Sequence, residues 1–305
     1  MRIAKSLAGF IVLLTPVAAL AAPKPAGGLD QAKIEQLTGA KGKLDEKAGV
    51  FKVSMPRSDL KVTAGGVHIP PPLGLSCWAA FTREGPHTAV MGDTVLTEDQ
   101  VNPVMSAALD NGLEVTALHN HFFWDTPKVM FMHIGGMGDE QKLATGVGAV
   151  FAKIKETSGG KGEIPKADID AAKSTLDPKK LDEVFSGRGA PGEYKDGVYK
   201  VVIGRSTKMG GHKMGKAMGV NTWAALAGSD DKAVIDGDFA MLEYELQPVL
   251  KSLRKSGINI VAIHQHMVGE QPRILFLHYW GLGKASDLAS AVVAALKETK
   301  HDNTP

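Results

Sequence analysis

Two stretches of the chain decide its organisation: "GLEVTALHNHFFWDTPKVMFMHIGGMGD" at residues 112–139 and "GINIVAIHQHMVGEQPRILFLHYWGLGK" at residues 257–284. Each holds three histidines, and every histidine of the first has a counterpart exactly 145 residues later in the second. These are His119, His121 and His133, followed by His264, His266 and His278. The same offset relates Trp78 to Trp223. Self-similarity at a fixed spacing indicates a duplication, so the chain contains two copies of one unit.

The duplication extends upstream of the histidines and divides the chain. "GVFKV" at residue 49 and "GVYKV" at residue 197 correspond after an adjustment of three residues. A Gly/Pro-rich stretch, "SGGKGEIPKAD", separates the two copies and is typical of a loop or linker. We therefore predict four segments: a signal peptide (1–21), repeat 1 (28–157), a linker (158–174) and repeat 2 (175–300).

The order of apolar patterns is the same in each copy. In the first, a short helix near residues 30–38 precedes strands in "VFKVSM", "LKVTA", "SCWAAF" and "HTAVMGD". A helix then begins at Thr97, whose hydroxyl suits an N-cap, and the histidine hairpin follows. A last helix is predicted over residues 140–156 because apolar residues recur there on one face. This order predicts an α+β fold with two tandem copies of an antiparallel sheet covered by helices.

The N-terminal residues have the pattern of an export signal. Arg2 and Lys5 precede an apolar run from Leu7 to Leu20, and small residues surround Ala21. The run is shorter than the roughly 20 residues that span a bilayer, so we expect cleavage and no stable membrane anchor. No cysteine follows the run to accept a lipid. The sequence predicts a periplasmic or secreted protein.

The net charge and the cysteine content limit the partners and the covalent cross-links that the protein can have. The chain has 35 basic and 33 acidic residues, and loss of Arg2 and Lys5 leaves 33 of each. A neutral mature chain lacks the basic surface that nucleic acid requires, so no nucleic-acid partner is expected. Cys77 is the only cysteine, which excludes an internal disulfide and makes a buried apolar role the simplest interpretation.

The histidine spacing predicts a cluster only in one strand register. Side chains alternate along a strand, so His119 and His121 should share a face. With a three-residue turn centred on Thr126, residue i pairs with residue 252 − i, and His133 lies directly opposite His119. A slip of one residue would send His133 to the other face.

Imidazole serves several purposes, and three interpretations of the cluster remain open: metal or ligand binding, hydrogen-bonded structural histidines, and acid–base catalysis without a metal. Between the copies, "HNHFFWDTPK" has changed to "HQHMVGEQPR" while every histidine is retained. This difference favours metal binding by His119, His121 and His133 and by His264, His266 and His278. Imidazole ligands with an open position suit a divalent ion such as zinc or copper.

Acidic residues near the histidines are candidates for a supporting role. Asp93 and Asp238 follow a repeated glycine, and either could complete a metal site or orient an imidazole; a turn aspartate is the simpler alternative. Asp125 and Glu270 lie four residues after the second histidine of each copy. That spacing is similar to the cupin motif, but the glycine expected after the acid is missing and the third histidine comes too early.

A Gly-rich loop, "KMGGHKMGKAMG", is a second candidate ligand site in repeat 2. It places His212 near three thioethers, Met209, Met214 and Met218. Thioether and imidazole together suit copper, whereas a flexible loop that happens to contain methionine is the structural alternative.

The hairpin signature, with "ALHNHFF" followed by "FMHIGG", the Gly-rich loops, the tryptophan and the Gly-Asp pair together resemble the LppY/LpqO family. The resemblance covers nearly the whole mature chain in two copies. It implies an exported bacterial protein but no particular activity. Tethering to a membrane does not carry over, because this chain lacks the lipid-attachment cysteine.

Three functions are compatible with these residues. The first is an exported protein with one three-histidine metal site per repeat, and no assigned reaction. The second is a metal-dependent hydrolase acting on an envelope component, with Asp93 and Asp238 as bases, although no nucleophile motif is present. The third is a non-enzymatic module in which the Gly-rich loops hold a small ligand. The sequence does not determine the oligomeric state.

Overall fold

The computed structural model describes residues 28–162, 164–188 and 191–299. The predicted signal peptide, residues 1–21, lies outside them. Among the described residues, no helix has the length and apolar character needed to cross a membrane.

Within the described residues, the first half contains three helices, six main strands and a small three-stranded sheet. The helices are α1 (Gln31–Thr38), α2 (Glu98–Asp110) and α3 (Glu140–Glu156). The main strands are β1 (Gly42–Asp45), β2 (Val50–Pro56), β5 (Ser76–Glu84), β6 (His87–Thr97), β7 (Glu114–Asn120) and β9 (Val129–Gly138). The small sheet consists of β3 (Val62–Ala64), β4 (Val67–Ile69) and β8 (Asp125–Thr126).

The second half repeats this arrangement. Its helices are α4 (Pro178–Val184), α5 (Leu246–Lys255) and α6 (Ala285–Leu296). Its main strands are β10 (Glu193–Lys195), β11 (Val198–Gly204), β14 (Asn221–Gly228), β15 (Ala233–Leu242), β16 (Asn259–His264) and β17 (Ile274–Gly283). A separate hairpin is formed by β12 (Thr207–Met209) and β13 (His212–Met214). Short 3-10 turns complete the chain at η1 (Pro71–Leu73), η2 (Ala171–Lys173), η3 (Lys216–Met218) and η4 (Glu243–Glu245).

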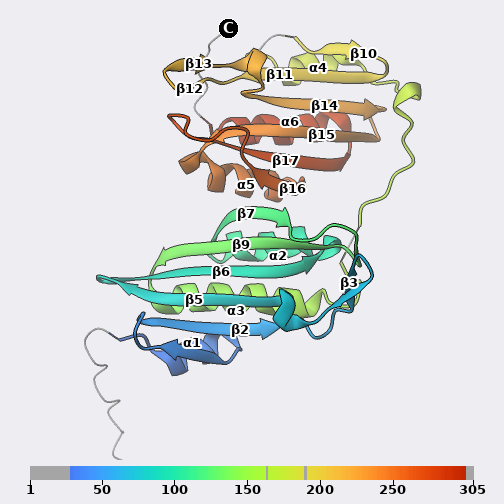
Figure 1. The fold of residues 1–305 in the computed structure, drawn as a ribbon. Helices are drawn as coiled ribbons and strands as arrows, with labels where there is room; N and C mark the ends of the chain where they lie inside the picture. Colours follow the sequence, from blue (N-terminus) through green and yellow to red (C-terminus); the bar gives the residue numbers. More distant parts are fainter. Residues whose placement is uncertain (1–27, 163, 189–190, 300–305) are drawn as a thin grey trace, which may run out of the picture.

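The main strands of both halves form one sheet of 12 strands, in the order β1-β2-β5-β6-β9-β7-β16-β17-β15-β14-β11-β10, with every neighbouring pair antiparallel (Figure 1). The order of the second half mirrors that of the first about the junction between β7 and β16. At this junction Leu118 pairs with Ile263, two residues that are themselves 145 positions apart. The predicted α+β fold is confirmed, and the two copies are related by a pseudo-twofold axis through the centre of the sheet.

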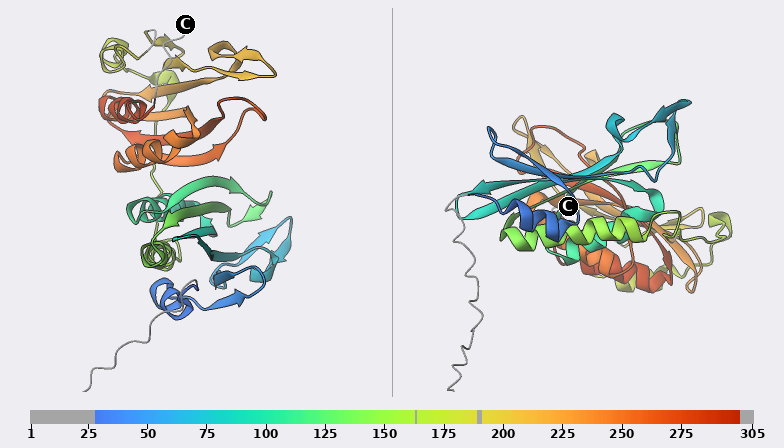
Figure 2. Two further views of the ribbon diagram at one scale, coloured as in Figure 1. Left: turned by 90° about the vertical axis from the view of Figure 1, so that its left-hand side faces the viewer. Right: turned by 90° about the horizontal axis from the view of Figure 1, so that it is seen from below.

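All six helices cover the same face of the sheet, and the small hairpins project from the opposite face (Figure 2). The strands follow this division. Leu118 and Ile134 are fully buried toward the helices. His119, which follows Leu118, and His133, which precedes Ile134, face the other way. We call the face without helices the open face. It carries the histidines of both copies.

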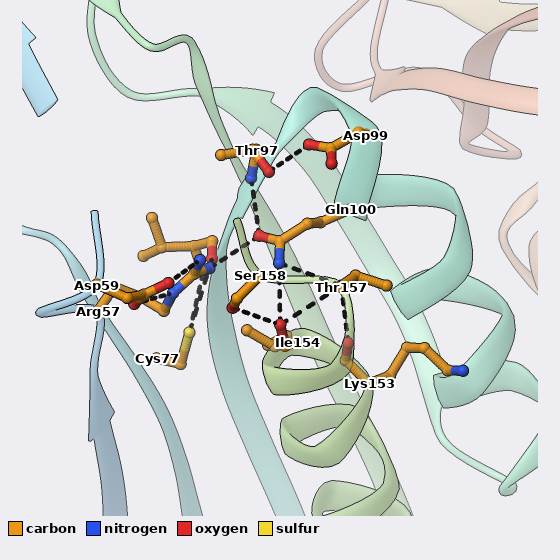
Figure 3. A network of polar contacts seen from close by, with 11 residues as sticks. Arg57, Asp59, Cys77, Thr97, Asp99, Gln100, Lys153, Ile154, Thr157 and Ser158 are labelled. Carbon is orange, nitrogen blue, oxygen red and sulfur yellow. Dashed lines mark hydrogen bonds and ion pairs between the residues drawn. The ribbon is translucent and has the colours of Figure 1, made fainter. Parts of the chain in front are cut away.

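The α2 helix begins as its sequence predicts. Thr97 and Gln100 form a capping box, in which the Gln100 side chain accepts from the Thr97 backbone N–H at 3.2 Å. Gln100 also donates to Ile154 O at 2.9 Å and to Thr157 Oγ1 at 3.1 Å, which ties α2 to the end of α3. The guanidinium of Arg57 completes this network by donating to Gln100 Oε1 (Figure 3).

Two amide side chains join the halves across the pseudo-twofold axis. Asn102 of α2 donates to Ile260 O at 3.2 Å and accepts from Ile260 N at 2.8 Å. Gln247 of α5 donates to Val115 O at 2.9 Å and accepts from Val115 N at 3.0 Å. Gln247 is the counterpart of Asn102, and Ile260 of Val115, so one contact is made twice. The N–H and C=O groups of Val115 and Ile260 lie where β7 and β16 are bulged. They therefore need hydrogen-bond partners from outside the sheet.

The single cysteine should be chemically inert in the folded protein. Cys77 is fully buried under the helices, and burial raises the pKa of its thiol to about 11. Only about one thiol in a thousand is then ionised at pH 8, and reagents cannot reach it. We expect no reaction with Ellman's reagent in the native protein and one equivalent in denaturant. Rapid native labelling would contradict the burial of Cys77.

Candidate functional site

Each copy builds its site from a row of side chains across the open face. In the first copy, Trp78 of β5 pairs with Asp93 of β6, which pairs with His133 of β9. The second copy forms the same row from its equivalent residues, Trp223, Asp238 and His278. Residues that pair across antiparallel strands share a face, so the aspartate lies between the tryptophan and the histidine in both copies.

The strand register differs from the predicted one. His119 lies opposite Phe131, and His133 lies opposite Ala117, so the prediction that His133 pairs directly with His119 was wrong by two residues. The reason is the connection between β7 and β9. It spans residues 121–128 and includes β8, which pairs with β3 of the small sheet, rather than a three-residue turn. A shift of two residues preserves the alternation of side chains, so His119 and His133 still share a face.

The second copy brings an aspartate and two histidines together. Asp238, His264 and His266 each offer one ligand atom, and these atoms lie within 4.8 Å of one another. The Nε2 atoms of His264 and His266 are 3.1 Å apart, and His266 Nε2 is 3.3 Å from Asp238 Oδ2. His278 stacks on His264 with ring centroids 4.4 Å apart, and its Nδ1 lies 3.9 Å from Asp238 Oδ1. This group of a buried aspartate and two histidines could hold a metal ion.

The first copy brings the Nε2 atoms of a different pair of histidines together. His119 Nε2 and His133 Nε2 are 3.1 Å apart, and His119 Nδ1 lies 3.0 Å from the carbonyl oxygen of Asn120. His121 lies just beyond the end of β7 and tilts over Phe131, with ring centroids 4.6 Å apart. Burial raises the pKa of the Asp93 carboxyl group, and all three histidines are close enough to oppose that rise.

Both aspartates are held in an environment that disfavours an isolated charge. Burial raises the pKa of Asp93 and of Asp238, and the neighbouring histidines act in the opposite direction. In each copy the aspartate Oδ1 is buried and has no hydrogen-bond partner among the described residues. The buried Nδ1 of His264 also has none. Burying a polar atom without a hydrogen-bond partner costs about 1–3 kcal/mol. A bound ligand that supplies the missing partner would offset this cost.

His264 is in the protonation state that metal binding requires. Burial, with smaller contributions from His278 and His266, lowers the pKa of His264 to about 4. Its imidazole is therefore neutral at pH 7, and no proton has to leave before a nitrogen binds a cation.

Asp125 and Glu270 occupy a different place from Asp93 and Asp238. The Asp125 carboxylate accepts from Val129 N at 2.8 Å, and Glu270 accepts from Ile274 N at 3.2 Å. Each therefore supports the first residue of the second hairpin strand.

The residues of the predicted methionine loop do not gather at one point. Met209 and His212 pair at the exposed end of the β12–β13 hairpin. Its turn, Gly210-Gly211, has φ values of 57° and 84°, which glycine adopts without strain. Met214 packs against a small apolar cluster on the open face, and Met218 lines a separate cavity.

Two phenylalanines form the floor of the sites and were not predicted. Phe276 stacks under His266 with ring centroids 3.5 Å apart and an interplanar angle of 11°, and Phe131 lies under His121. Both phenylalanines are buried on the open face, at 0% and 2% exposure. They are related by the 145-residue offset, so the repeat itself carried the signal that could have identified them.

The molecule is thus a duplicated α+β protein with an Asp/His cluster on the open face of each copy. The chain belongs to the DUF1529 family, described as a Domain of Unknown Function (DUF1259), whose model matches residues 32–153 and 180–298. The two matches agree with the duplication predicted from the sequence.

No curated protein matches the chain. Among solved structures, the trimeric bacterial microcompartment shell protein PduB is 12% identical with a TM-score of 0.20, over 84% of this chain and 89% of that one. Aspartate kinase from Synechocystis is 8% identical with a TM-score of 0.14, over 72% of this chain and 41% of that one. These scores are too low to transfer any property to the site.

Proposed function

We propose that this protein binds divalent metal ions, one in each copy, on the open face of its sheet. The observation that carries the proposal is the group formed by Asp238, His264 and His266, whose ligand atoms lie within 4.8 Å of one another. The unpartnered, buried Oδ1 of Asp238 supports it, because a cation would compensate the cost of burying that carboxylate.

The first copy supports a second site with the same kinds of donor. His119 and His133 are in contact, and Asp93 carries the same unpartnered oxygen as Asp238. His121 and His278 are the remaining imidazole of each copy, and each lies near the corresponding aspartate. Imidazole nitrogen with carboxylate oxygen suits zinc and copper(II), and a set of three protein donors leaves a position open for a small ligand.

The metal content of designed variants tests this proposal. Protein stripped with EDTA and dialysed against zinc should hold about two ions per chain by mass spectrometry of the metal. His119→Ala and His264→Ala should each hold one ion, and the double variant none. Asp238→Asn keeps the shape of the side chain but removes its charge, and should weaken zinc binding in the second copy by about 10- to 100-fold.

Two histidines outside the clusters provide matched controls. His87 and His212 are exposed at strand ends, and His87→Ala and His212→Ala should each retain both ions. Circular dichroism should show the same secondary structure in every variant. A wild-type protein that holds no zinc, or a double variant that holds as much as wild type, would refute the proposal.

We also propose that the protein is exported to the periplasm or the medium. The basic residues Arg2 and Lys5 with the apolar run after them support export, as does the resemblance of the hairpin signature to the LppY/LpqO family. A small ligand or an envelope component is then the class of molecule that would meet the open face.

A further inference from the structure

A cavity of about 670 Å³ lies on the open face of the second copy, outside the histidine cluster. Its polar lining consists mainly of three lysines, Lys200, Lys213 and Lys216, against one carboxylate, Glu193. Val202 and Met218 contribute apolar surface. This volume falls within the range of small-molecule sites, roughly 300–1,000 Å³.

The three lysines are available to bind an anion. Within the described part of the chain none of them forms an ion pair with a carboxylate. The Nζ atom of Lys200 instead lies over the ring of Trp223, 4.5 Å from its centroid. Such a contact holds the ammonium group in place without neutralising its charge.

The position of the cavity links it to the histidine cluster. Val202 in the cavity wall pairs with Trp223, and Trp223 pairs with Asp238. Neighbouring strands lie about 4.8 Å apart, so the wall of the cavity is about 10 Å from the carboxylate of the cluster. The side chain of Trp223 lies between the cavity wall and Asp238.

The first copy lacks this arrangement. Lys200 has the counterpart Lys52, which lies over Trp78 in the same way, 4.0 Å from its ring centroid. The counterparts of Lys213 and Lys216 are His68 and Pro71, so two of the three cations are absent. The first copy has a lysine, Lys43, where the cavity has Pro191, but it lacks both cations of the loop that closes the cavity.

We propose that this cavity is a binding site for a small anionic molecule with an apolar portion, such as an aryl or acyl phosphate or carboxylate. The lysines supply charge-assisted hydrogen bonds to the acidic group, and Val202 and Met218 contact the apolar portion. The site exists without a metal, so it goes beyond the metal binding proposed above. Its position lets a bound molecule extend over Trp223 toward Asp238.

Calorimetric titration of 1-naphthyl phosphate into EDTA-treated protein, in a buffer free of phosphate, tests the inference. We expect one saturable site per chain, and no comparable binding of the neutral compound 1-naphthol. The Lys213→Ala/Lys216→Ala variant should weaken binding by about tenfold or more, because two charged donors are removed.

The matched control removes two charges from the first copy. Lys43 and Lys52 occupy the positions that correspond to Pro191 and Lys200, and Lys43→Ala/Lys52→Ala should bind the probe as wild type does. The inference is overturned if the probe does not bind, if 1-naphthol binds equally well, or if both double variants weaken binding to the same extent. Because the protein is freed of metal with EDTA and then dialysed before the titration, none of these outcomes depends on the metal site.

Discussion

Replacing Glu245 with alanine should lower the free energy of unfolding by about 3–5 kcal/mol, one of the two largest effects we expect for this protein. Arg205 Nη1 donates to Glu245 Oε2 at 2.7 Å, and the two side chains are only 5% and 1% exposed. Loss of the carboxylate leaves a buried guanidinium without its countercharge. Urea unfolding followed by circular dichroism measures the change as a lower midpoint at an unchanged slope.

Glu243 provides the control for this variant. It belongs to the same 3-10 turn, is 62% exposed, and lies 3.5 Å from the half-exposed Arg273. An exposed ion pair contributes about 0–1 kcal/mol, so Glu243→Ala should be nearly neutral. If both variants lose the same small amount, the buried ion pair is not a major source of stability.

The first copy satisfies the equivalent arginine differently. Arg57 is also buried and donates to Asp59 through Nε and Nη2, both at 2.9 Å (Figure 3). Gln100, a neutral residue, takes the place of Glu245. The second copy lacks a counterpart of residues 59–61, which accounts for the three-residue adjustment between the upstream strands. Each copy thus retains one carboxylate for its buried arginine, supplied by a different segment.

The Asn102→Ala/Gln247→Ala variant should lose about 2–6 kcal/mol, because each side chain satisfies both the N–H and the C=O of a residue in the other half. Each single variant should lose about half as much. Among the described residues, the halves are otherwise joined by one paired position of the sheet, Leu118 with Ile263, and by a hydrogen bond of 3.1 Å that Arg254 Nε of α5 donates to Ser106 Oγ of α2. We therefore expect the double variant to unfold in two steps, detected as separate transitions by calorimetry.

Asn111→Ala is the matched amide control. Asn111 caps the C-terminus of the same helix, but its side chain is exposed and, among the described residues, donates a hydrogen bond only to Ala107 O. Its removal should change stability by no more than about 0.5 kcal/mol. A double variant as stable and as cooperative as the control would show that the amides do not join the halves.

The sequence predicted the fold well because the longer helices and strands have a strong local signal. The α3 helix begins at Glu140 and ends at Glu156, as the spacing of its apolar residues predicts. The duplication predicted that the second half repeats the first. The joining of both halves in one sheet could not be predicted from the sequence. It depends on one pair of central strand residues and on the amide side chains of Asn102 in α2 and Gln247 in α5.

The site was harder to predict than the fold because it depends on register. Local alternation places His119 and His133 on one face, but the pairing is set by the long connection, whose β8 strand pairs with β3 far away in sequence. The two copies also differ within the cluster. The Nε2 atom of His119 lies 3.1 Å from that of His133, whereas the Nε2 atom of His264 lies 3.1 Å from that of His266 and its ring stacks on His278. Identical spacing therefore fixes which residues gather, and side-chain packing decides which of them touch.

The junction between β7 and β16 has the form of a twofold homodimer interface. The patch that Asn102 and Val115 present on one half is presented by Gln247 and Ile260 on the other, so the contact is isologous. The linker holds both halves in one chain, and their effective concentration is therefore fixed by its length rather than by the amount of protein. A homodimer would dissociate on dilution, whereas the contact between the two halves of this chain does not depend on protein concentration.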